Sequence, residues 1–257
     1  MQWHTTEDGK YRIESLSAAT FPGALKVLKD YFLKDEAVCI GTAVDKDPLA
    51  QEELLELCAD AALDGLSVVA VDNDSGEVVS VVFNKLQERP SETSGKTFFE
   101  IFTEERCKRP SSREMMDFMV DLDARCNFFE RYGVDCCSEL MFLGTHRAHR
   151  QKGLAKLVCK TSMDLAKKLK DGPVAPMTIE DLGPKYSFMK PRKPVKRPPQ
   201  LCHALWSAVG SKKVGQDLGF EVIIDVPLKE FVFDGKPYSE RIGAETTCEG
   251  AAIRIDK

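Results

Sequence analysis

The chain has 257 residues, enough for one large domain whose core needs no disulfide or metal support. Its composition, 43% hydrophobic and 30% charged, is that of a folded globular protein, and its net charge of −5 excludes a general affinity for nucleic acid. Apolar runs are shorter than the roughly 20 residues of a membrane helix, and the N-terminus carries no secretion signal. We therefore expect a cytoplasmic protein that binds no membrane and whose anion sites are local.

The nine cysteines predict neither a disulfide framework nor a zinc site. Their number is odd, no Cys-x-x-Cys occurs, and most stand in apolar stretches, which indicates reduced, buried thiols. His146 and His149 form the one close histidine pair, but no cysteine or carboxylate stands at ligand spacing from it. We expect no bound metal.

The hydrophobic pattern of the first 65 residues predicts one strand and two helices. Residues 11–16 alternate between apolar and polar, as a half-buried strand does. Apolar residues at steps of four, three and four then indicate one face of a helix; they are Phe21, Leu25, Leu28 and Phe32. A second helix is expected over 48–63, with Asp47 as its N-cap and Pro48 at its first position.

After residue 65 the hydrophobic pattern changes from a helical period to that of strands. The β-rich runs 66–72 and 78–86 are joined by a polar turn that ends in Gly76, which is typical of an antiparallel hairpin. After a polar loop, Ser111 and Glu114 have the spacing of a capping box, and the helix that they begin is expected to end at Gly133.

In the second half, residues 140–143 are expected to form a buried strand and residues 154–169 a strongly amphipathic helix. The segment from about 171 to 200 is rich in Pro, Lys and Arg, so we interpret it as a surface insertion. Four further elements are expected: strand 201–206, helix 212–218, strand 220–233 and strand 251–255. The sum is a single α/β domain over 1–257, with a mixed sheet and helices on both faces.

The turn between strand 140–143 and helix 154–169 is the most informative segment. It is basic, with Arg147, Arg150 and Lys152, and it places Gly153 at the start of the helix. The first N–H groups of a helix lack internal partners and carry partial positive charge, so they suit a phosphate or pyrophosphate. Glycine lets the backbone approach such a ligand, and the cations add charge-assisted hydrogen bonds. The alternative is a plain connection with solvated basic residues.

Arg150-x-x-Gly153-x-Ala155 resembles the acetyl-CoA signature of the GNAT superfamily of N-acetyltransferases. The order of the expected elements agrees with that superfamily. Further stretches resemble the insect-type arylalkylamine (dopamine and serotonin) N-acetyltransferases; they are 31–36, 64–81, 128–135 and 207–220. The resemblance implies the GNAT fold, with a single mixed, mostly antiparallel twisted sheet, and acetyl-CoA as co-substrate. The residues that it implies for acetyl-CoA binding are Leu143, Gly144, Thr145, Arg150, Gln151, Lys152, Gly153, Leu154 and Ala155.

Acetyl transfer from a thioester needs a deprotonated amine, a held oxyanion and a protonated leaving thiolate. In the resembling family the glutamate of an Asp-Glu pair is the general base, and Glu36 matches it. Two serines four residues apart are linked to the thiolate or the amine pocket, and they match Ser207 and Ser211. Each of these three residues also has a simpler structural explanation. Glu36 would end a helix, Ser207 would end a strand and Ser211 would be the N-cap of a helix. The fold implies an oxyanion donor among the backbone N–H groups near Thr145.

The expectation of an aromatic amine as acceptor rests on the resemblance alone. Four residues could line an aromatic pocket, but their helical or strand spacing is equally typical of core packing; they are Phe32, Met141, Phe142 and Trp206. The insertion of about 30 residues departs from the family and is a candidate cover for the amine pocket. Three alternatives stay open: another acceptor such as a polyamine, an amino acid or a protein amine; a catalytically silent coenzyme A binder; and a protein that docks partners through the basic Pro-x-x-Pro stretch at 190–199.

Overall fold

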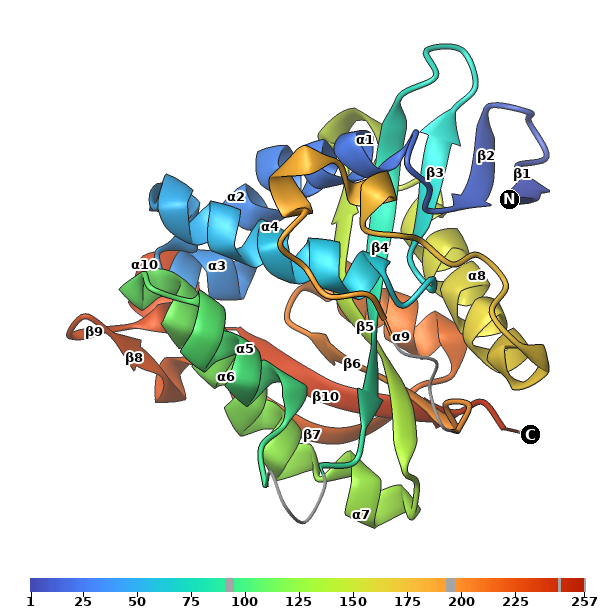
Figure 1. Ribbon diagram of the computed structural model, residues 1–257. Coiled ribbons are helices and arrows are strands. Elements are labelled where there is room, and N and C mark those ends of the chain that lie inside the picture. The colour runs from blue at the N-terminus through green and yellow to red at the C-terminus, as the bar shows by residue number, and fades with distance from the viewer. Residues whose placement is uncertain (91–94, 193–196, 245, 257) are drawn as a thin grey trace.

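Eight strands form one sheet in the order β1-β2-β3-β4-β5-β6-β10-β7 in the computed structural model, which describes residues 1–90, 95–192, 197–244 and 246–256 (Figure 1). Their bounds are β1 Gln2–Thr5, β2 Tyr11–Ser15, β3 Val68–Asp72, β4 Val78–Glu88, β5 Cys136–Thr145, β6 Leu201–Trp206, β7 Glu221–Pro227 and β10 Thr247–Arg254. The pair β5/β6 is parallel and the other neighbouring pairs are antiparallel. The predicted mixed, mostly antiparallel sheet is therefore confirmed. Two short strands, β8 Val232–Phe233 and β9 Lys236–Pro237, pair separately.

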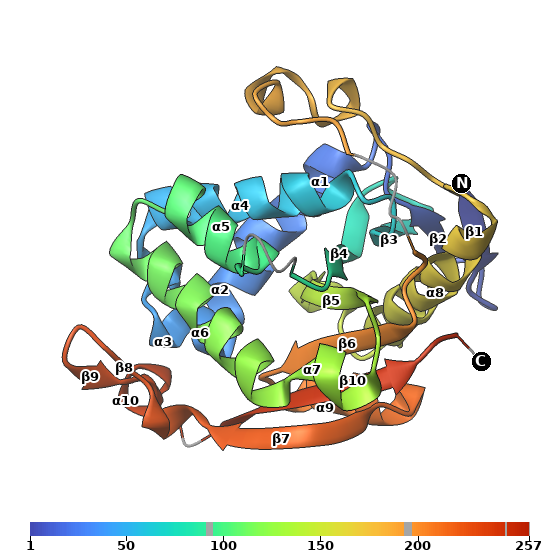
Figure 2. The same ribbon diagram turned by 60° about the horizontal axis from the view of Figure 1, so that its bottom comes forward.

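Helices cover both faces of this sheet, as Figures 1 and 2 show. The helices are α1 Phe21–Val27, α2 Leu33–Asp35, α3 Ala37–Gly41, α4 Pro48–Ala62, α5 Phe98–Arg106, α6 Pro110–Cys126, α7 Phe128–Tyr132, α8 Leu154–Lys168, α9 Val209–Leu218 and α10 Tyr238–Ile242. Strand β4 divides the core: Val81 and Phe83 pack with α1, α4 and α6, whereas Val82 packs with α8 on the other face. Val79 joins Val82 there because a register shift beside it interrupts the alternation. No helix within the described ranges is both long and apolar enough to cross a bilayer.

The parallel pair β5/β6 is short, and its end creates the opening in which the candidate site lies. The two strands pair only from Cys137 opposite Leu201 to Glu139 opposite His203, and beyond this point they separate. On its other side β5 stays paired with β4, except that Met141 has no residue opposite it. This extra residue is a β-bulge, and bulges re-aim side chains beside active sites.

The expected start of the helix after the hairpin is wrong. Helix α6 begins at Pro110, so Ser111 lies inside it and forms no capping box with Glu114. The carboxylate of Glu53, from α4, instead accepts hydrogen bonds from the N–H groups of the residues that precede α6. Glu114 accepts a hydrogen bond from the hydroxyl of Tyr238. A helix that was not expected, α5, has the capping box, formed by its N-cap Thr97 and by Glu100.

Four other boundaries differ from the prediction. The expected strand 220–233 is interrupted after Pro227 by a helical turn, and the last strand starts at Thr247 rather than at 251 and lies between β6 and β7. Helix α9 starts at Val209 rather than at 212. The helix expected to end at Gly133 is split at Asn127, whose positive φ of 48° ends α6, and Gly133 ends α7.

The insertion is more closely packed than its composition predicts. Met177, Leu182 and Tyr186 are buried, and the Tyr186 ring packs edge-to-face on Phe21 of α1. Arg192 pairs with the carboxylates at the C-terminal end of α4. The expected Pro-x-x-Pro docking motif at 190–199 includes residues 193–196, which lie outside the described residues. The described part of the insertion covers α1 and α4, where Figure 2 shows it.

Candidate active site

A cavity of about 750 Å³ fills the opening between β5 and β6. Its walls come from β5 and β6, the ends of α2, α8 and α9, and the face of α6 that points at the sheet. One end reaches the basic turn at residues 147–153, and another part reaches Glu139, where the two strands begin to separate. A volume of this size suits a small-molecule site. Within the described chain, no residue of the insertion lines this cavity, so the expected cover of the pocket is not observed.

The basic turn presents free backbone amides to the cavity. Gln151 and Gly153 both adopt left-handed conformations, with φ of 61° and 75°. Gly153 is the N-cap of α8, and no side chain caps this helix. Left-handed residues within a turn direct successive N–H groups toward one point, which forms an anion-binding nest. The adjoining amides at the start of α8 carry the positive end of the helix dipole. This geometry suits a pyrophosphate.

The cations of the turn are held by an acidic residue that the sequence did not single out for this purpose. Asp35 contacts Arg147 at 2.5 Å and Arg150 at 2.7 Å, and these guanidinium groups, first Arg147, hold the pKa of its carboxyl below the usual value. Arg150 also donates to the carbonyl of Thr145 at 3.1 Å. Asp35 therefore connects the turn to the segment that carries Glu36. Lys152 points elsewhere: it donates to the Tyr11 hydroxyl at 2.9 Å and does not line the cavity.

Reversing the charge of Arg150 is expected to weaken acetyl-CoA binding about 10- to 100-fold, because a charge-assisted hydrogen bond is worth about 1.5–3 kcal/mol. Titration calorimetry of Arg150→Glu with acetyl-CoA measures this. Lys160→Glu is the control, since Lys160 lies on α8 with an exposed side chain outside the cavity and the change in net charge is the same. An unaltered dissociation constant in Arg150→Glu would count against an anion site at the turn.

Glu36 lines the cavity as the N-cap of α3. Its backbone is extended, and its Oε2 accepts a hydrogen bond from the N–H of Cys39 at 2.7 Å. Its Oε1 accepts a hydrogen bond from the hydroxyl of Ser207, at the end of β6. Glu36 does end one helix, as the C-cap of α2, but it also begins the next, and its half-buried side chain faces the cavity rather than open solvent.

The two serines have different surroundings although both line the cavity. Ser207 contacts Glu36, whereas the Ser211 hydroxyl bonds the backbone N–H and C=O of Ala208 at 3.2 and 2.9 Å. Ser211 is thus in the first turn of α9 and is not its N-cap. Its local bonds stabilise the start of that helix, whereas Ser207 orients a carboxylate.

This difference predicts unequal effects. Ser207→Ala removes a donor to a charged group and is expected to lower kcat about tenfold. Ser211→Ala is expected to change kcat less than about threefold and to cost about 0.5–1 kcal/mol of stability through the weaker helix start. Steady-state kinetics and urea denaturation of both variants measure these effects. A larger loss of kcat in Ser211→Ala than in Ser207→Ala contradicts the assignment.

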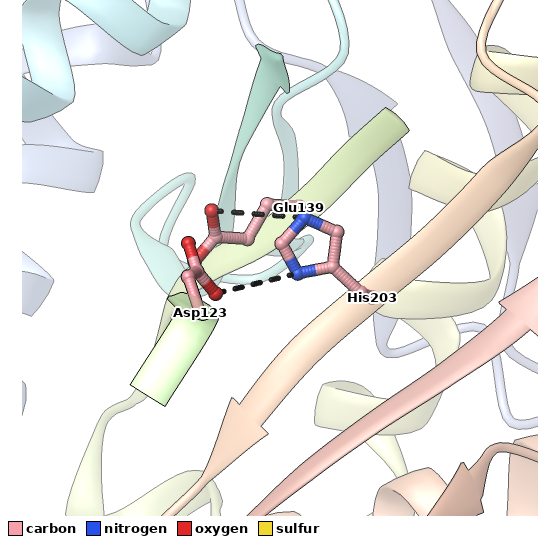
Figure 3. Close-up of side chains that lie close together, drawn as sticks. All are labelled: Asp123, Glu139 and His203. Atoms are coloured by element: carbon pink, nitrogen blue, oxygen red, sulfur yellow. Dashed lines mark ion pairs between the residues drawn. The ribbon is translucent and has the colours of Figure 1, made fainter. Parts of the chain in front are cut away.

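A buried polar cluster at the inner end of the cavity was not predicted. Figure 3 shows His203 of β6 between two carboxylates, with Nδ1 at 4.0 Å from Asp123 of α6 and Nε2 at 4.0 Å from Glu139 of β5. Burial raises the pKa of Asp123 to about 7, raises that of Glu139 well above its usual range and lowers that of His203 to about 3. Of the three residues only Glu139 lines the cavity. His203 precedes the expected Ser207 by four residues, so strand alternation was the available signal.

The same three residues form a group of possible metal ligands within 4.8 Å of one another. Each imidazole nitrogen, however, faces a different carboxylate at 4.0 Å, whereas a zinc ion binds its ligands at about 2.0–2.2 Å. The geometry is that of an imidazole between two carboxyl groups.

Most residues expected at the site do lie together at the cavity. They are Glu36, Leu143, Gly144, Thr145, Arg150, Gln151, Gly153, Leu154, Ala155, Ser207 and Ser211, and Lys152 is the exception. Phe32, Met141, Phe142 and Trp206 line it too. Sequence reasoning missed Met115, Phe118 and Met119, which belong to one face of α6 and form a wall of the cavity.

No protein-family model and no curated protein matches the sequence. Solved structures do match its fold. Arylalkylamine N-acetyltransferase 2 from Aedes aegypti has a TM-score of 0.70 at 17% identity, over 95% of this chain and 99% of that one. A mosquito arylalkylamine N-acetyltransferase-like 5b gives 0.71 at 16% identity, over the same shares. Drosophila melanogaster polyamine N-acetyltransferase, described as forming N-acetylagmatine, gives 0.67 at 14% identity, also over 95% and 99%.

The chain therefore has the GNAT fold of acyl-CoA-dependent N-acetyltransferases. More closely, its fold is that of the insect arylalkylamine N-acetyltransferases, as the sequence resemblance predicted.

Proposed function

We propose that this protein transfers the acetyl group of acetyl-CoA to the primary amine of a small arylalkylamine. The observation that carries the proposal is one cavity that joins an anion-binding turn to a half-buried carboxylate, Glu36. The expected acceptors are dopamine, tyramine, octopamine, serotonin and tryptamine. The similarity in fold to N-acetyltransferases of arylalkylamines and of polyamines supports amine acetylation in general.

On the donor side, the amides of the basic turn and of the start of α8 bind the pyrophosphate, and Arg150 adds a charge. The edge of β5 at Leu143, Gly144 and Thr145 faces the opening, because β6 pairs with β5 only as far as Glu139. Backbone groups of this edge, other than the Thr145 carbonyl that accepts from Arg150, pair with the amide groups of the pantetheine arm. The thioester is then directed along β5 toward the bulge at Met141.

On the acceptor side, Glu36 accepts the proton that the amine loses. The amine nitrogen attacks the thioester carbon, the N–C bond forms as the C–S bond breaks, and the thiolate takes up a proton to leave as coenzyme A. We place the oxyanion donor at the N–H of Met141 rather than near Thr145, because Met141 has no partner residue in β4 whereas Thr145 is paired with Ser80. Ser207 orients Glu36 and does not itself transfer a proton in this scheme.

A thiol-release assay with acetyl-CoA and a panel of amines tests the proposal. Turnover of tyramine, dopamine, octopamine, serotonin or tryptamine is the expected result. Far faster acetylation of spermidine, agmatine or a peptide would remove the aromatic acceptor and keep the acetyltransferase. If calorimetry detects acetyl-CoA binding but no amine is turned over, the protein would be a catalytically silent coenzyme A binder.

A further inference from the structure

Resting on this proposed function, we propose that the inner end of the cavity is a subsite for the ring hydroxyl of the amine, with the Glu139 carboxyl as its hydrogen-bond partner. The substrate class is then narrower than arylalkylamines: it is arylalkylamines with a hydroxyl at the end of the ring remote from the amine. Glu36 binds one end of the molecule and Glu139 the other.

The first support is the position of Glu139. Its side chain is 1% exposed, yet it lines the cavity at the point where β5 and β6 separate. Its Oε2 accepts a hydrogen bond from the amide of the buried Gln87, and Nε2 of His203, whose ring packs on Phe128, lies 4.0 Å from the same oxygen. The carboxyl is thus fixed between rigid strands rather than placed on a loop. Buried polar groups are found where they have partners, and a ligand hydroxyl would be one.

The second support is the spacing between the two carboxyl groups. His203 and Leu205 lie on one face of β6, and Ser207 follows directly after the strand; His203 neighbours Glu139, and Ser207 donates to Glu36. Four residues of strand span about 13 Å at a rise of about 3.3 Å per residue. A hydrogen bond of about 3 Å at each end leaves roughly 7 Å between the ligand atoms. An extended arylethylamine with a para hydroxyl spans such an interval from nitrogen to oxygen.

The third support is the character of the walls between these ends. They are aromatic and thioether side chains: Phe32, Met115, Phe118, Met119, Met141 and Phe142. Rings and polarisable sulfurs pack well on an aromatic ring. Burial, followed by the nearby Asp123 carboxylate, raises the pKa of Glu139 well above its usual range, and this shift favours a neutral partner such as a hydroxyl.

Matched pairs of amines test the subsite: tyramine against phenethylamine, and serotonin against tryptamine, which differ only by the hydroxyl. We expect the protein to favour the hydroxylated member by about 10²-fold or more in kcat/KM, because a site built to bond a hydroxyl is left unpaired by the analogue without it. Glu139→Met is expected to reduce this preference to about tenfold or less, mainly by slowing the hydroxylated amines. Glu139→Gln keeps a hydrogen-bonding group and is expected to retain most of the preference.

The outcomes separate the two proposals. Equal rates for tyramine and phenethylamine in the unaltered protein overturn the subsite, whatever the variants do, and leave amine acetylation standing. An equal loss of kcat/KM for all amines in both Glu139 variants also overturns the subsite, because Glu139 would then affect the reaction or the folding of the protein. Preference for 1,4-diaminobutane over tyramine would make the inner end a cation site instead. Failure of every amine contradicts the proposed function itself.

Discussion

Glu36→Gln is expected to lower kcat about 10²- to 10⁴-fold at neutral pH, which is the usual contribution of a general base. The substitution leaves the local structure in place, since a glutamine Oε1 still accepts the hydrogen bond from Cys39 that caps α3. It removes the group that takes the proton from the amine. The dissociation constant of acetyl-CoA is expected to stay within about twofold, because Glu36 does not belong to the basic turn.

The pH dependence makes this prediction specific. A primary ammonium has a pKa of about 10, so a rise in pH supplies free amine without help from the protein. The deficit of Glu36→Gln is therefore expected to shrink as the pH rises from about 7 to 9. Steady-state thiol release over this range measures it, with Glu52→Gln as the control, because Glu52 is an α4 carboxylate outside the cavity. Equal pH–rate profiles for Glu36→Gln and the unaltered protein would exclude Glu36 as the base.

Features with a local sequence signal were predictable. The Asp47 cap, the hairpin and the strand–turn–helix around Gly153 are set by residues within a few positions of one another, and the structure has all three. The basic turn was recognisable because glycine, arginine and a helix start occur together there. Its link to Asp35 was not, because the two segments are more than 110 residues apart in the chain.

The inner end of the cavity had no such signal. Glu139 lies in an apolar strand and His203 in another, and only the parallel pairing of β5 with β6 brings them together. Their roles depend on a register that hydrophobic alternation alone does not specify. The site could therefore be predicted at the donor end, where one turn forms it, but not where three separate elements meet.

Composition was misleading for the insertion. Prolines and charges predicted a solvated surface segment, yet three apolar side chains among them anchor it to α1 and α4. Its remaining attachment is electrostatic. Arg192 reaches Asp60 and Asp64 at the end of α4, and Asp64 also binds Lys85 of β4. A charge run in sequence does not tell whether its members are solvated or paired with buried partners.

Lys85→Met is expected to lower the free energy of unfolding by about 3–5 kcal/mol, the cost of leaving one partner of a buried ion pair uncompensated. The Lys85 and Asp64 side chains are 3% and 1% exposed, and their charged atoms are 2.6 Å apart. Lys85 Nζ also donates to the carbonyl of Leu86 at 3.1 Å and lies 4.3 Å from the centre of the Phe98 ring. Methionine fills similar space but supplies neither the charge nor the hydrogen bonds, so Asp64 keeps only Arg192 as a cationic partner, besides the N–H of Leu86.

Urea denaturation compares this variant with Lys96→Met, which removes an exposed pair with Glu104 and is expected to cost at most about 1 kcal/mol. The midpoint should fall in Lys85→Met with little change in the slope, because a lower midpoint at equal slope reports lost stability of the same folded state. Asp64→Asn, which leaves Lys85 and Arg192 with one carboxylate between them, is expected to be destabilised to a similar extent. If both buried variants unfolded at the midpoint of Lys96→Met, the cluster would not hold the insertion, α4 and β4 together, and the apolar anchors at Met177, Leu182 and Tyr186 would have to do so alone.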